Sequence, residues 1–561
     1  MKNNKLTPGG TSDRLFEACE AETRIMGRLS GVFEEAGYRK VRTPGLEFLS
    51  VFGGPASYFP VEEMYKFTDS EGRLVAVRPD STIPIARLAA TKLKGGSMPV
   101  KLYYSQNVFR RQPEHRGRDS EVMQMGVEHI GEAGFSADVD MIDLAVRALG
   151  AVCEGGFQVE LGHVGLFKQL MARLDADADF VERIHRYVNA KNYSALEDAL
   201  VETGDRRTAE MIMRLPRLFG GTEALDEAAV LFDDYDEDIR GMLDYLRRVM
   251  DELTARGHGE SVTIDLGLVG RSEYYSSLVF KGYGENAGEP LLSGGRYDAL
   301  LKDFGEELPA TGFGMNIDLL VEGAFPADEA GQAAGQADGG QRGVQEGRPL
   351  RVSLAKGKLE EGFIALMEKA GYDMSPLYEK GRKLIIGIDG PGGSKAGALE
   401  IFLAKAPDVV TSVEHGACEI GIVGKDTLLE QGGTYFEIMD LGLGKCRFAL
   451  AAPSGSPVAA GSAPQVVASK YPLYAGRYFE RLGLDVRIIR IEGSVEIAPL
   501  IGLADGIVDL VETGTTLREN GLEVVEYIRD ISARLIVNMS SMKLRKREIE
   551  ALAALLKSAS V

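Results

Sequence analysis

The stretch YYSQNVFRRQPEHRGRDSEVMQMGVEHIG, residues 103–131, decides the fold of the first half of this chain. It holds two long runs in which apolar and polar residues alternate, which is typical of antiparallel strands with one covered face. Further strand-like runs lie on both sides of it, and a helix-rich insert is expected over residues 165–255. Because strands come in runs with helices segregated from them, the first half is predicted to be an α+β domain with an antiparallel sheet.

An amphipathic helix is expected before these strands, ending at Gly37. Its apolar residues recur at helical spacing and are Leu15, Cys19, Ile25, Leu29 and Phe33. The four cysteines, at 19, 153, 418 and 446, lack the spacing of a metal or redox site, so reduced thiols in a cytoplasmic protein are expected. Cys19 and Cys418 lie in apolar-periodic contexts, which predicts that both are buried.

Length and composition restrict the function. The chain has 561 residues, 44% of them apolar, and a formal charge of −20. This length predicts three or four domains. No apolar run is long enough to span a bilayer, and MKNNKLTPGG lacks the apolar core of a secretory signal, so neither a membrane nor export is expected. The acidic balance disfavours nucleic acid as a partner but leaves small anionic substrates open, because local loops can supply cations and N–H donors.

Residues 326–348, PADEAGQAAGQADGGQRGVQEGR, differ from the rest of the chain. Fifteen of these 23 residues are Ala, Gly or Gln, and none is aromatic. Such a segment cannot bury a core, so a flexible linker is predicted, with a span of roughly 25 Å. It separates two globular halves, residues 1–325 and 349–561.

The second half has a different pattern. Short continuous apolar runs such as LRVSLA, EIGIVG and CRFALAAP alternate with helical patterns, which predicts parallel α/β sheets. There is room for two lobes with a cleft between them. The expected bounds are about 349–440 plus 530–561 for the first lobe and about 441–529 for the second.

Three blocks in the first half carry chemistry. They are AVRPDSTIPIARLAATKL at 76–93, the stretch at 103–131, and GLVGRSEYYSSLVF with SGGRYDALLKDFG within 267–305. In this order they closely resemble the catalytic domain of histidyl-tRNA synthetase, a class II synthetase, over nearly all of residues 10–323. The resemblance implies a histidine pocket lined by Asp80, Thr82, Arg110, Gln124, Glu128 and Tyr274 or Tyr275.

The chemistry of these residues suits such a pocket. Arg110 can fork onto a carboxylate, and carboxylate and amide oxygens can accept an amino group and an imidazole N–H. Gln124 and Glu128 are an even number apart, so both face one side of a strand. Purely structural roles compete: Ser81 can cap the following helix with Pro84 in its first turn, Arg110 and Glu128 can form an ion pair on a sheet, and the tyrosines can be core aromatics. The joint pattern favours the pocket.

The first half departs from synthetases where ATP is held. The Glu-Arg-Pro run of the second motif corresponds to Gln112, Pro113 and Glu114, the adenine-stacking arginine to Leu319, and the arginine of the histidine-specific LVRGLDYY pattern to Gly270, next to Arg271. Losing these cations removes stabilisation of a transferring adenylyl group. A histidine pocket without adenylation chemistry resembles the regulatory subunit of ATP phosphoribosyltransferase, and tRNA is not an expected partner.

Residues 350–539 resemble the short catalytic subunit of that enzyme nearly end to end. The matching stretches include LRVSLAKGKL, DVVTSVEHGACEIGIVGKDTLLE and GSVEIAPLIGLADGIVDLVETGTTLRENGL. The long form carries a further C-terminal regulatory domain of ferredoxin-like shape, whereas REIEALAALLKS after Asn538 predicts one terminal helix. The resemblance implies a two-lobed, periplasmic-binding-protein-like phosphoribosyltransferase of the short form, with its regulator fused on.

The implied reaction is attack by adenine N1 of ATP on the anomeric carbon of phosphoribosyl pyrophosphate (PRPP), the first step of histidine biosynthesis, with histidine as feedback inhibitor. Because pyrophosphate departs, N–H donors, cations and Mg²⁺ held with the substrate phosphates are expected, without a dedicated metal cage. The residues assigned to catalysis and PRPP are Asp509, Glu512, Thr513, Gly514, Thr515, Thr516 and Lys356. Those assigned to ATP and phosphate are Lys358, Arg382, Lys405, Lys425 and Glu496.

The run TGTT at 513–516 has two explanations that do not compete. Its backbone N–H groups would hold the 5-phosphate at a helix start, and Gly514 lets the backbone approach closely. Thr516 and Glu519 also have the spacing of a capping box. A well-capped helix start still leaves N–H groups for an anion.

Alternatives remain open at the level of sequence. Without the resemblance, Lys356 and Lys425 would be solvated lysines, Arg382 structural and Asp505 a turn cap. The chain would then be a histidyl-tRNA synthetase-like ligase with an appended α/β ligand-binding domain, or its second half a solute-binding module. Fold does not decide function, but the PRPP-type loop favours the transferase. Both families form dimers, so a dimer-based homo-oligomer, a tetramer or larger, is expected.

Overall fold

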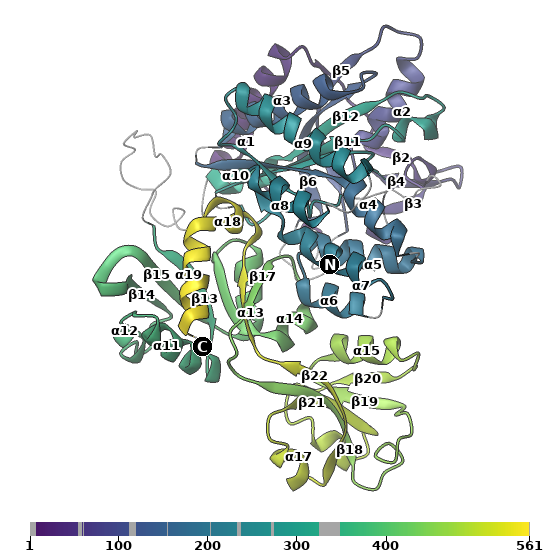
Figure 1. Cartoon of the computed structure of the whole chain (residues 1–561). Coiled ribbons are helices and arrows are strands. Elements are labelled where there is room, and N and C mark those ends of the chain that lie inside the picture. The colour runs from purple at the N-terminus through teal and green to yellow at the C-terminus, as the bar shows by residue number, and fades with distance from the viewer. Residues whose placement is uncertain are drawn as a thin grey trace. The chain divides into compact units, whose positions relative to one another are not determined.

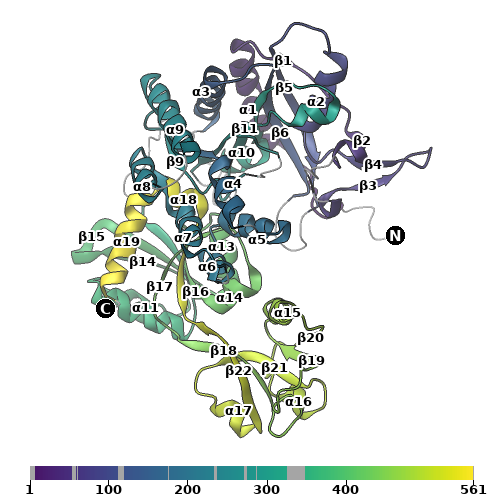
Figure 2. The same cartoon turned by 45° about the vertical axis from the view of Figure 1, so that its right-hand side comes forward.

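The computed structural model describes residues 7–53, 59, 61–111, 119–153, 155–174, 176–201, 203–232, 237–270, 274–285, 287–324 and 348–559. The chain divides into two compact units, Met1–Val344 (unit 1) and Gln345–Val561 (unit 2). Both units are drawn in Figures 1 and 2. The predicted linker lies outside the described residues except for Arg348. No helix in the described ranges has the length and apolar character needed to cross a membrane.

Unit 1 is built, within the described residues, on a nine-stranded sheet of order β1-β5-β6-β12-β11-β10-β7-β9-β8. The strands from β5 to β7 in this order pair antiparallel, which confirms the predicted antiparallel sheet. Parallel pairs occur only near the sheet edges in the described part, between β1 and β5 and between β7 and β9. The bounds are β1 Arg39–Lys40, β5 Val100–Phe109, β6 Glu121–Ile130, β7 Phe157–His163, β8 Phe219–Gly220, β9 Val262–Asp265, β10 Leu278–Gly284, β11 Leu292–Arg296 and β12 Ala310–Asn316.

Helices α1 (Phe16–Glu35) and α3 (Phe135–Val152) pack on one face of this sheet. The buried stripe of α1 includes Ile25, Leu29 and Phe33, as the periodicity predicts. The prediction was wrong for Leu15, which precedes the helix and is exposed, and for Cys19, which is also exposed. Cys19 lies two positions before the buried Ala21, so it points away from the stripe.

The predicted helical insert is confirmed. Between β7 and β9 the described residues form six helices, interrupted only by the short edge strand β8 between α7 and α8. They are α4 Val164–Arg173, α5 Ala178–Asn189, α6 Tyr193–Val201, α7 Arg206–Arg214, α8 Glu223–Leu231 and α9 Glu237–Ala255. A buried ion pair ties the insert to the sheet, because Lys191 Nζ lies 2.8 Å from Asp265 Oδ1 at the end of β9.

The second face of the unit 1 sheet carries helix α2 (Thr82–Lys92) and a cluster of buried apolar and aromatic side chains, among them Tyr104 and Tyr297. Beside it lies a small sheet of order β2-β4-β3. Its strands are β2 Leu46–Phe48, β3 Lys66–Thr68 and β4 Leu74–Val77, and the unit ends in α10, Ile317–Ala324. Both faces of the main sheet are therefore covered, which differs from the single covered face predicted from alternation.

Unit 2 contains two sheets in its described part, of order β14-β15-β13-β16-β23-β17 and β20-β19-β21-β18-β22. The strands of the first are β13 Leu350–Ala355, β14 Ile385–Gly390, β15 Ser394–Ala404, β16 Ile420–Gly424, β17 Phe436–Asp440 and β23 Ala533–Val537. Those of the second are β18 Cys446–Pro453, β19 Val466–Ser469, β20 Arg487–Arg490, β21 Gly506–Val511 and β22 Leu522–Ile531. We call the two sheets with their helices the first and second lobes; residues 441–445 and Ser532 connect them.

The prediction of parallel sheets was wrong, because both sheets are mixed. Strands joined through helices pair in parallel, as β13 does with β15 and β16, and β19 with β20 and β21. Strands joined by tight turns pair antiparallel, as β14 and β15 do across Pro391–Gly393. Antiparallel pairs need only a short connection, whereas apolar runs look alike in both kinds of pair.

The helices of unit 2 complete the two lobes. They are α11 Lys358–Lys369, α12 Ser375–Tyr378, α13 Ala406–Glu414, α14 Lys425–Gln431, α15 Pro472–Arg481, α16 Ile497–Leu500, α17 Thr515–Glu519, α18 Met539–Leu544 and α19 Lys546–Ala559. The terminal helix α19 lies beside α11, as Figure 2 shows. Cys418, just before β16, is buried as predicted.

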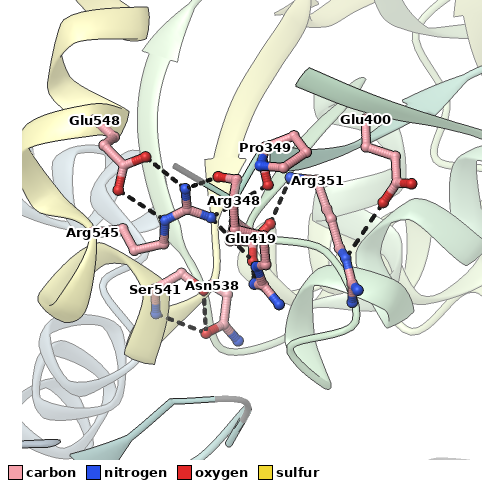
Figure 3. Close-up of polar contacts among 9 residues, drawn as sticks. All are labelled: Arg348, Pro349, Arg351, Glu400, Glu419, Asn538, Ser541, Arg545 and Glu548. Carbon is pink, nitrogen blue, oxygen red and sulfur yellow. Dashed lines mark hydrogen bonds and ion pairs between the residues drawn. The ribbon is translucent and has the colours of Figure 1, made fainter. Parts of the chain in front are cut away.

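A cluster of charges fixes the chain where it enters unit 2 (Figure 3). Glu419 is only 3% exposed, and its Oε2 accepts the backbone N–H of Arg351 at 2.6 Å. Its Oε1 pairs with the guanidinium of Arg348 and lies 3.6 Å from that of Arg545. Arg545 also donates to the carbonyl oxygens of Arg348 at 2.6 Å and Pro349 at 3.4 Å. We call these residues the entry clamp.

Replacing Glu419 with glutamine is expected to lower the free energy of unfolding of unit 2 by about 1–2 kcal/mol, because the neutral amide weakens the bond to the Arg351 N–H and removes the charge paired with Arg348, while Arg545 keeps only Glu548. For a unit of this size the midpoint temperature should fall by about 3–6 °C, measured by calorimetry on the full chain. The control is Glu400→Gln, since Glu400 is 35% exposed and 3.5 Å from Arg351. Its shift should stay within about 1 °C. Equal shifts in the two variants would contradict a special role of the clamp.

Candidate functional sites

The first site lies on the α2-bearing face of the unit 1 sheet. Gln124 and Glu128 on β6 face neighbouring glycines of β12, where a Cβ on Gly312 would come within 2.2 Å of Glu128 Oε2 and one on Gly314 within 2.7 Å of Gln124 Nε2. Met125 and Val127, between them in sequence, belong to the core on the opposite face. The two polar side chains therefore face the same side of the sheet, as predicted. Gln124 is partly buried and Glu128 fully buried, although polar residues on a strand normally face water.

Glu128 is a buried carboxyl with a raised pKa and one oxygen that lacks a hydrogen-bond donor within the described ranges. It is 1% exposed, and Tyr297 donates its hydroxyl to Oε2. Burial raises the pKa of Glu128 to about 8, against the lowering effect of hydroxyl groups from Thr82 and Tyr297. Among the described residues, no group donates a hydrogen bond to Glu128 Oε1, and the buried Oε1 of Gln124 accepts none. Unsatisfied buried oxygens are costly, so both are candidates to accept N–H groups of a bound molecule.

The start of α2 closes the site from a second side. Asp80 Oδ1 accepts the backbone N–H of Ile83 at 2.9 Å and so caps this helix, whereas Ser81 makes no capping bond. Arg110 donates from Nε to the carbonyl of Pro79 at 2.8 Å. In the described part of the chain Arg110 donates to this backbone carbonyl and Glu128 accepts from the Tyr297 hydroxyl, so the two side chains do not form the ion pair that was considered as a structural role. Asp80 thus serves the helix start, in the role proposed for Ser81.

Aromatic rings form a third wall. The rings of Tyr274 and Tyr275 meet edge to face at 4.9 Å, and Tyr274 lies 5.5 Å from Tyr297. Burial raises the pKa of the Tyr274 hydroxyl well above its ordinary value, and Asp80 and Glu128 add to this effect. The structure thus brings Asp80, Glu128 and Tyr274 together.

Sequence analysis missed two residues that lie beside Glu128 in this site, Tyr104 and Tyr297. Both are buried next to Glu128, and their pKa values are raised by burial first and then by Glu128. A signal was present for Tyr104, because it occupies the position of β5 paired with Gly126, between Gln124 and Glu128 on β6. Tyr297 stands in the quoted block SGGRYDALLKDFG but had no distinguishing neighbour.

The departures from synthetases have a structural basis in two places. Leu319 on α10 packs against the apolar core of unit 1. Gly270 has φ +52°, and a Cβ there would lie 3.0 Å from the Tyr275 ring and 3.2 Å from Val164 and Val279. A long cationic side chain therefore has no room at Gly270. Gln112, Pro113, Glu114 and Arg271 lie outside the described residues.

The second site is formed in unit 2 by loops that follow parallel strands. Lys356 comes directly after β13 and donates its backbone N–H to the carbonyl of Ala404 at 3.1 Å, next to Lys405, which precedes α13. Ligands bind outside the carboxyl ends of strands in open α/β sheets. Lys356 and Lys405 therefore lie at the edge where a ligand is expected. Arg382, in the turn before β14, is exposed, and no contact in the described part of the unit joins it to this edge.

Lys425, assigned to phosphate from the sequence, does not lie in an exposed loop. Its side chain is 2% exposed and its Nζ lies 2.5 Å from Glu437 Oε2, inside the first lobe. Burial lowers the pKa of Lys425 to about 8, against the raising effect of Glu437. Because lysine is normally solvated and Lys425 directly follows a strand, the sequence suggested that its side chain would lie in an exposed loop. In this structure the ammonium is paired with Glu437 and turned inward.

Asp509 lies near the end of β21 in the second lobe. Burial raises the pKa of its carboxyl, which accepts the backbone N–H of Leu510 at 2.8 Å. Lys470 lowers this pKa and Glu496 raises it, so both are close to Asp509. Sequence analysis missed Lys470, although it follows β19 as Lys356 follows β13. A lysine after a short apolar run in each lobe was the available signal.

The loop after β21 differs in detail from the predicted capping box. Helix α17 begins at Thr515 with Gly514 as its N-cap at φ +71°, and no side chain makes a capping bond. Thr516 is the second residue of this five-residue helix and not its N-cap, so Thr516 and Glu519 do not form a capping box. Instead the Thr515 N–H approaches the Thr513 hydroxyl at 3.5 Å. No acceptor among the described residues takes the backbone N–H of Thr513 or Gly514.

The two lobes meet at this loop. Lys358 Nζ, at the start of α11 in the first lobe, lies 2.7 Å from Glu512 Oε2, which precedes the loop in the second lobe. Both side chains are largely exposed, so the pair is weak and open to exchange with a ligand. Arg518 adds a cation, because it donates to the Thr513 carbonyl at 3.3 Å and the Thr515 hydroxyl at 3.4 Å. The structure therefore unites Lys358, Glu512 and the Thr513–Thr516 loop.

Comparison with known proteins matches both units. The histidyl-tRNA synthetase family model matches residues 10–320, and the ATP phosphoribosyltransferase model matches residues 405–558. An ATP phosphoribosyltransferase regulatory subunit from Clostridium acetobutylicum is 37% identical over 56% of this chain and 78% of its own length.

Solved structures agree with this. The crystal structure of an ATP phosphoribosyltransferase regulatory subunit/histidyl-tRNA synthetase from Bacillus halodurans is 30% identical with a TM-score of 0.52, covering 71% of this chain and 92% of that one. A histidine–tRNA ligase subunit from Alicyclobacillus acidocaldarius is 25% identical with a TM-score of 0.50, covering 58% and 98%. The chain belongs to the histidyl-tRNA synthetase-like family of ATP phosphoribosyltransferase regulatory subunits and carries an ATP phosphoribosyltransferase domain fused to it.

Proposed function

We propose that this chain catalyses the transfer of the phosphoribosyl group of PRPP to N1 of ATP, and that histidine bound to unit 1 lowers the rate. The observation that carries the proposal is the approach of Lys358 to Glu512, which places cations of the first lobe against the Thr513–Thr516 loop of the second. A polyanionic substrate such as PRPP needs N–H donors and ammonium groups from both sides. The unit would then be a two-lobed, periplasmic-binding-protein-like enzyme of the short form.

The residues would divide the task by chemistry. The backbone N–H groups of Thr513 and Gly514 bind the 5-phosphate, and Asp509 and Glu512 accept ribose hydroxyls. Lys356 and Lys358 balance the charge of the departing pyrophosphate, since Lys358 readily exchanges its exposed carboxylate partner for a phosphate. Lys405 and Glu496 provide further contacts to ATP. Adenine N1 carries no proton at the attack, so no general base is required.

Magnesium is proposed to enter with the substrate phosphates. No group of three or more His, Cys, Asp or Glu side chains in the described part of the chain is placed to hold a metal ion. Asp509 and Glu512 precede the loop in the chain, and their carboxylates fit a cation that is held mainly by phosphate oxygens. When bound, Mg²⁺ supplies charge neutralisation of the pyrophosphate.

Unit 1 is proposed to be the histidine sensor. Its pocket offers buried oxygens of Glu128 and Gln124 without hydrogen-bond donors among the described residues, and the guanidinium of Arg110 for a carboxylate. We propose that residues 326–348 form a flexible tether, that the chain assembles as a dimer-based oligomer, and that tRNA is not a substrate.

The test is an assay of the purified full chain with ATP, PRPP and Mg²⁺, with and without histidine. Formation of phosphoribosyl-ATP that histidine suppresses is the expected result. Lack of product would overturn the transferase assignment, and product unaffected by saturating histidine would overturn the feedback assignment. Histidine-dependent exchange of pyrophosphate into ATP, measured without PRPP, would instead favour the ligase alternative.

A further inference from the structure

The two lobes of unit 2 are joined by a second set of contacts, between helices α14 and α15. Tyr471, the residue before α15, donates its hydroxyl to Asp426 Oδ2 on α14 at 2.9 Å. Glu430 accepts the first backbone N–H groups of α15, from Leu473 at 3.1 Å and Tyr474 at 2.9 Å. All three bonds cross from the first lobe to the second, and we call them the latch.

The first-lobe side of the latch is firmly anchored. Lys425 begins α14, and its buried ammonium is held by Glu437 at 2.5 Å. Its backbone N–H donates to the carbonyl of Ser532, which connects the two lobes, at 3.0 Å. Arg534 ties Glu437 at 2.8 Å to Asp440 at 2.6 Å on the same network. Helix α14 is thus fixed to the segment about which one lobe would turn against the other.

The second-lobe side of the latch lies next to the ligand loops. Tyr471 follows Lys470, and Asp426 is close enough to influence the titration of Asp509. The Tyr471 ring meets Phe448 on β18 edge to face at 5.0 Å, so its direction is set by packing. A change in the latch would therefore alter the distance between Lys358 and the Thr513–Thr516 loop.

We propose that Tyr471, Asp426 and Glu430 are positioning residues, which hold the two lobes at the spacing where cations of the first and N–H donors of the second reach one PRPP molecule. The identity of the ligand rests on the proposed function, whereas the holding role does not. None of the three needs to touch the substrate. They act through the orientation of the lobes.

The test compares two tyrosines of the same helix, Tyr471 at the N-cap of α15 and Tyr478 within it. Tyr471→Phe removes the bond to Asp426 across the lobes, and Tyr478→Phe removes an equivalent bond to Glu526, at 2.7 Å, within the second lobe. In the full chain, Tyr471→Phe is expected to raise the KM for PRPP about tenfold with a smaller change in kcat. It is also expected to speed amide hydrogen exchange in α14 and at the start of α15. Tyr478→Phe should leave both KM and the exchange of α14 unchanged.

Glu430→Ala is an independent variant that removes the other two bonds of the latch, those from the N–H groups of Leu473 and Tyr474. A raised KM for PRPP and faster exchange in α14 are expected here too. Unchanged KM and unchanged exchange in Tyr471→Phe and Glu430→Ala would overturn the proposal, as would equal effects in Tyr478→Phe. If the wild-type chain makes no phosphoribosyl-ATP, the proposed function fails, and the exchange measurement still decides whether the latch holds the lobes. Faster exchange of α14 in Tyr471→Phe but not in Tyr478→Phe would support the holding role of the latch.

Discussion

Valine in place of Gly514 is expected to lower kcat/KM for PRPP about 100-fold, through the loss of preorganised N–H donors at the phosphate loop. Gly514 has φ +71°, and its Cβ position has only ordinary contacts, at 3.7 Å to Arg518 and Val511. The effect should therefore come from the backbone, which a β-branched residue would pull out of the left-handed region. The measurement is initial velocity against PRPP concentration for the full chain.

The matched control is Gly502→Val in the same lobe. Gly502 has φ +73°, and nothing lies within 4 Å of its Cβ position. Both variants should lose about 1–2 kcal/mol in the free energy of unfolding, because both put a β-branched residue where the native backbone is left-handed, a conformation that valine disfavours. Only the Gly514 variant should lose affinity for PRPP. Equal kinetics in the two variants would show that the loop does not bind the substrate.

Glutamine in place of Glu128 is expected to raise the histidine concentration needed for half inhibition by about 10- to 100-fold, with the uninhibited rate unchanged. Binding of an N–H group favours the ionised carboxylate, a hydrogen bond to which contributes about 1.5–3 kcal/mol, and the amide lacks the second acceptor oxygen. The measurement is the inhibition curve of phosphoribosyl-ATP formation. Loss of the uninhibited rate along with inhibition would indicate that Glu128 has a structural role only.

The pKa of Glu128 makes this prediction depend on pH. It is raised from the ordinary 4.5 to about 8, so between these values the folded pocket keeps a proton that the unfolded chain releases. The free energy of unfolding of unit 1 should therefore fall as pH rises across this window in the wild type and fall less in Glu128→Gln. If histidine binds the anionic carboxylate, inhibition should strengthen as pH approaches about 8. A wild-type stability curve that matches the variant would contradict the assigned pKa.

Periodicity and residue order predicted the elements well where one cause dominated. The antiparallel sheet of unit 1 and the shared face of Gln124 and Glu128 follow from the two-residue period of a strand, which needs no tertiary information. The prediction that Cys19 is buried was wrong, because helical periodicity alone does not decide which face of the helix packs against the sheet. In unit 2 the sequence did not distinguish parallel from antiparallel pairing, because buried strands are equally apolar in both kinds of sheet.

Site residues were harder to predict when their environment came from distant segments. Lys356 and Lys425 both follow a strand, yet Lys425 turns inward because Glu437, on another strand, supplies its partner. Tyr297 joins the unit 1 pocket only because β11 and β12 carry it next to Glu128. The expected helix start in the run TGTT is present, but its first residue, Thr515, depends on the left-handed backbone of Gly514, which these letters do not specify.

The entry clamp joins the first residues of unit 2 to the segment before its last helix, since Arg545 holds the carbonyl oxygens of Arg348 and Pro349. The beginning and the terminal helix of this unit are thus neighbours, and neither can be shortened without loosening the other. A stand-alone catalytic unit should start no later than Arg348 and retain α19.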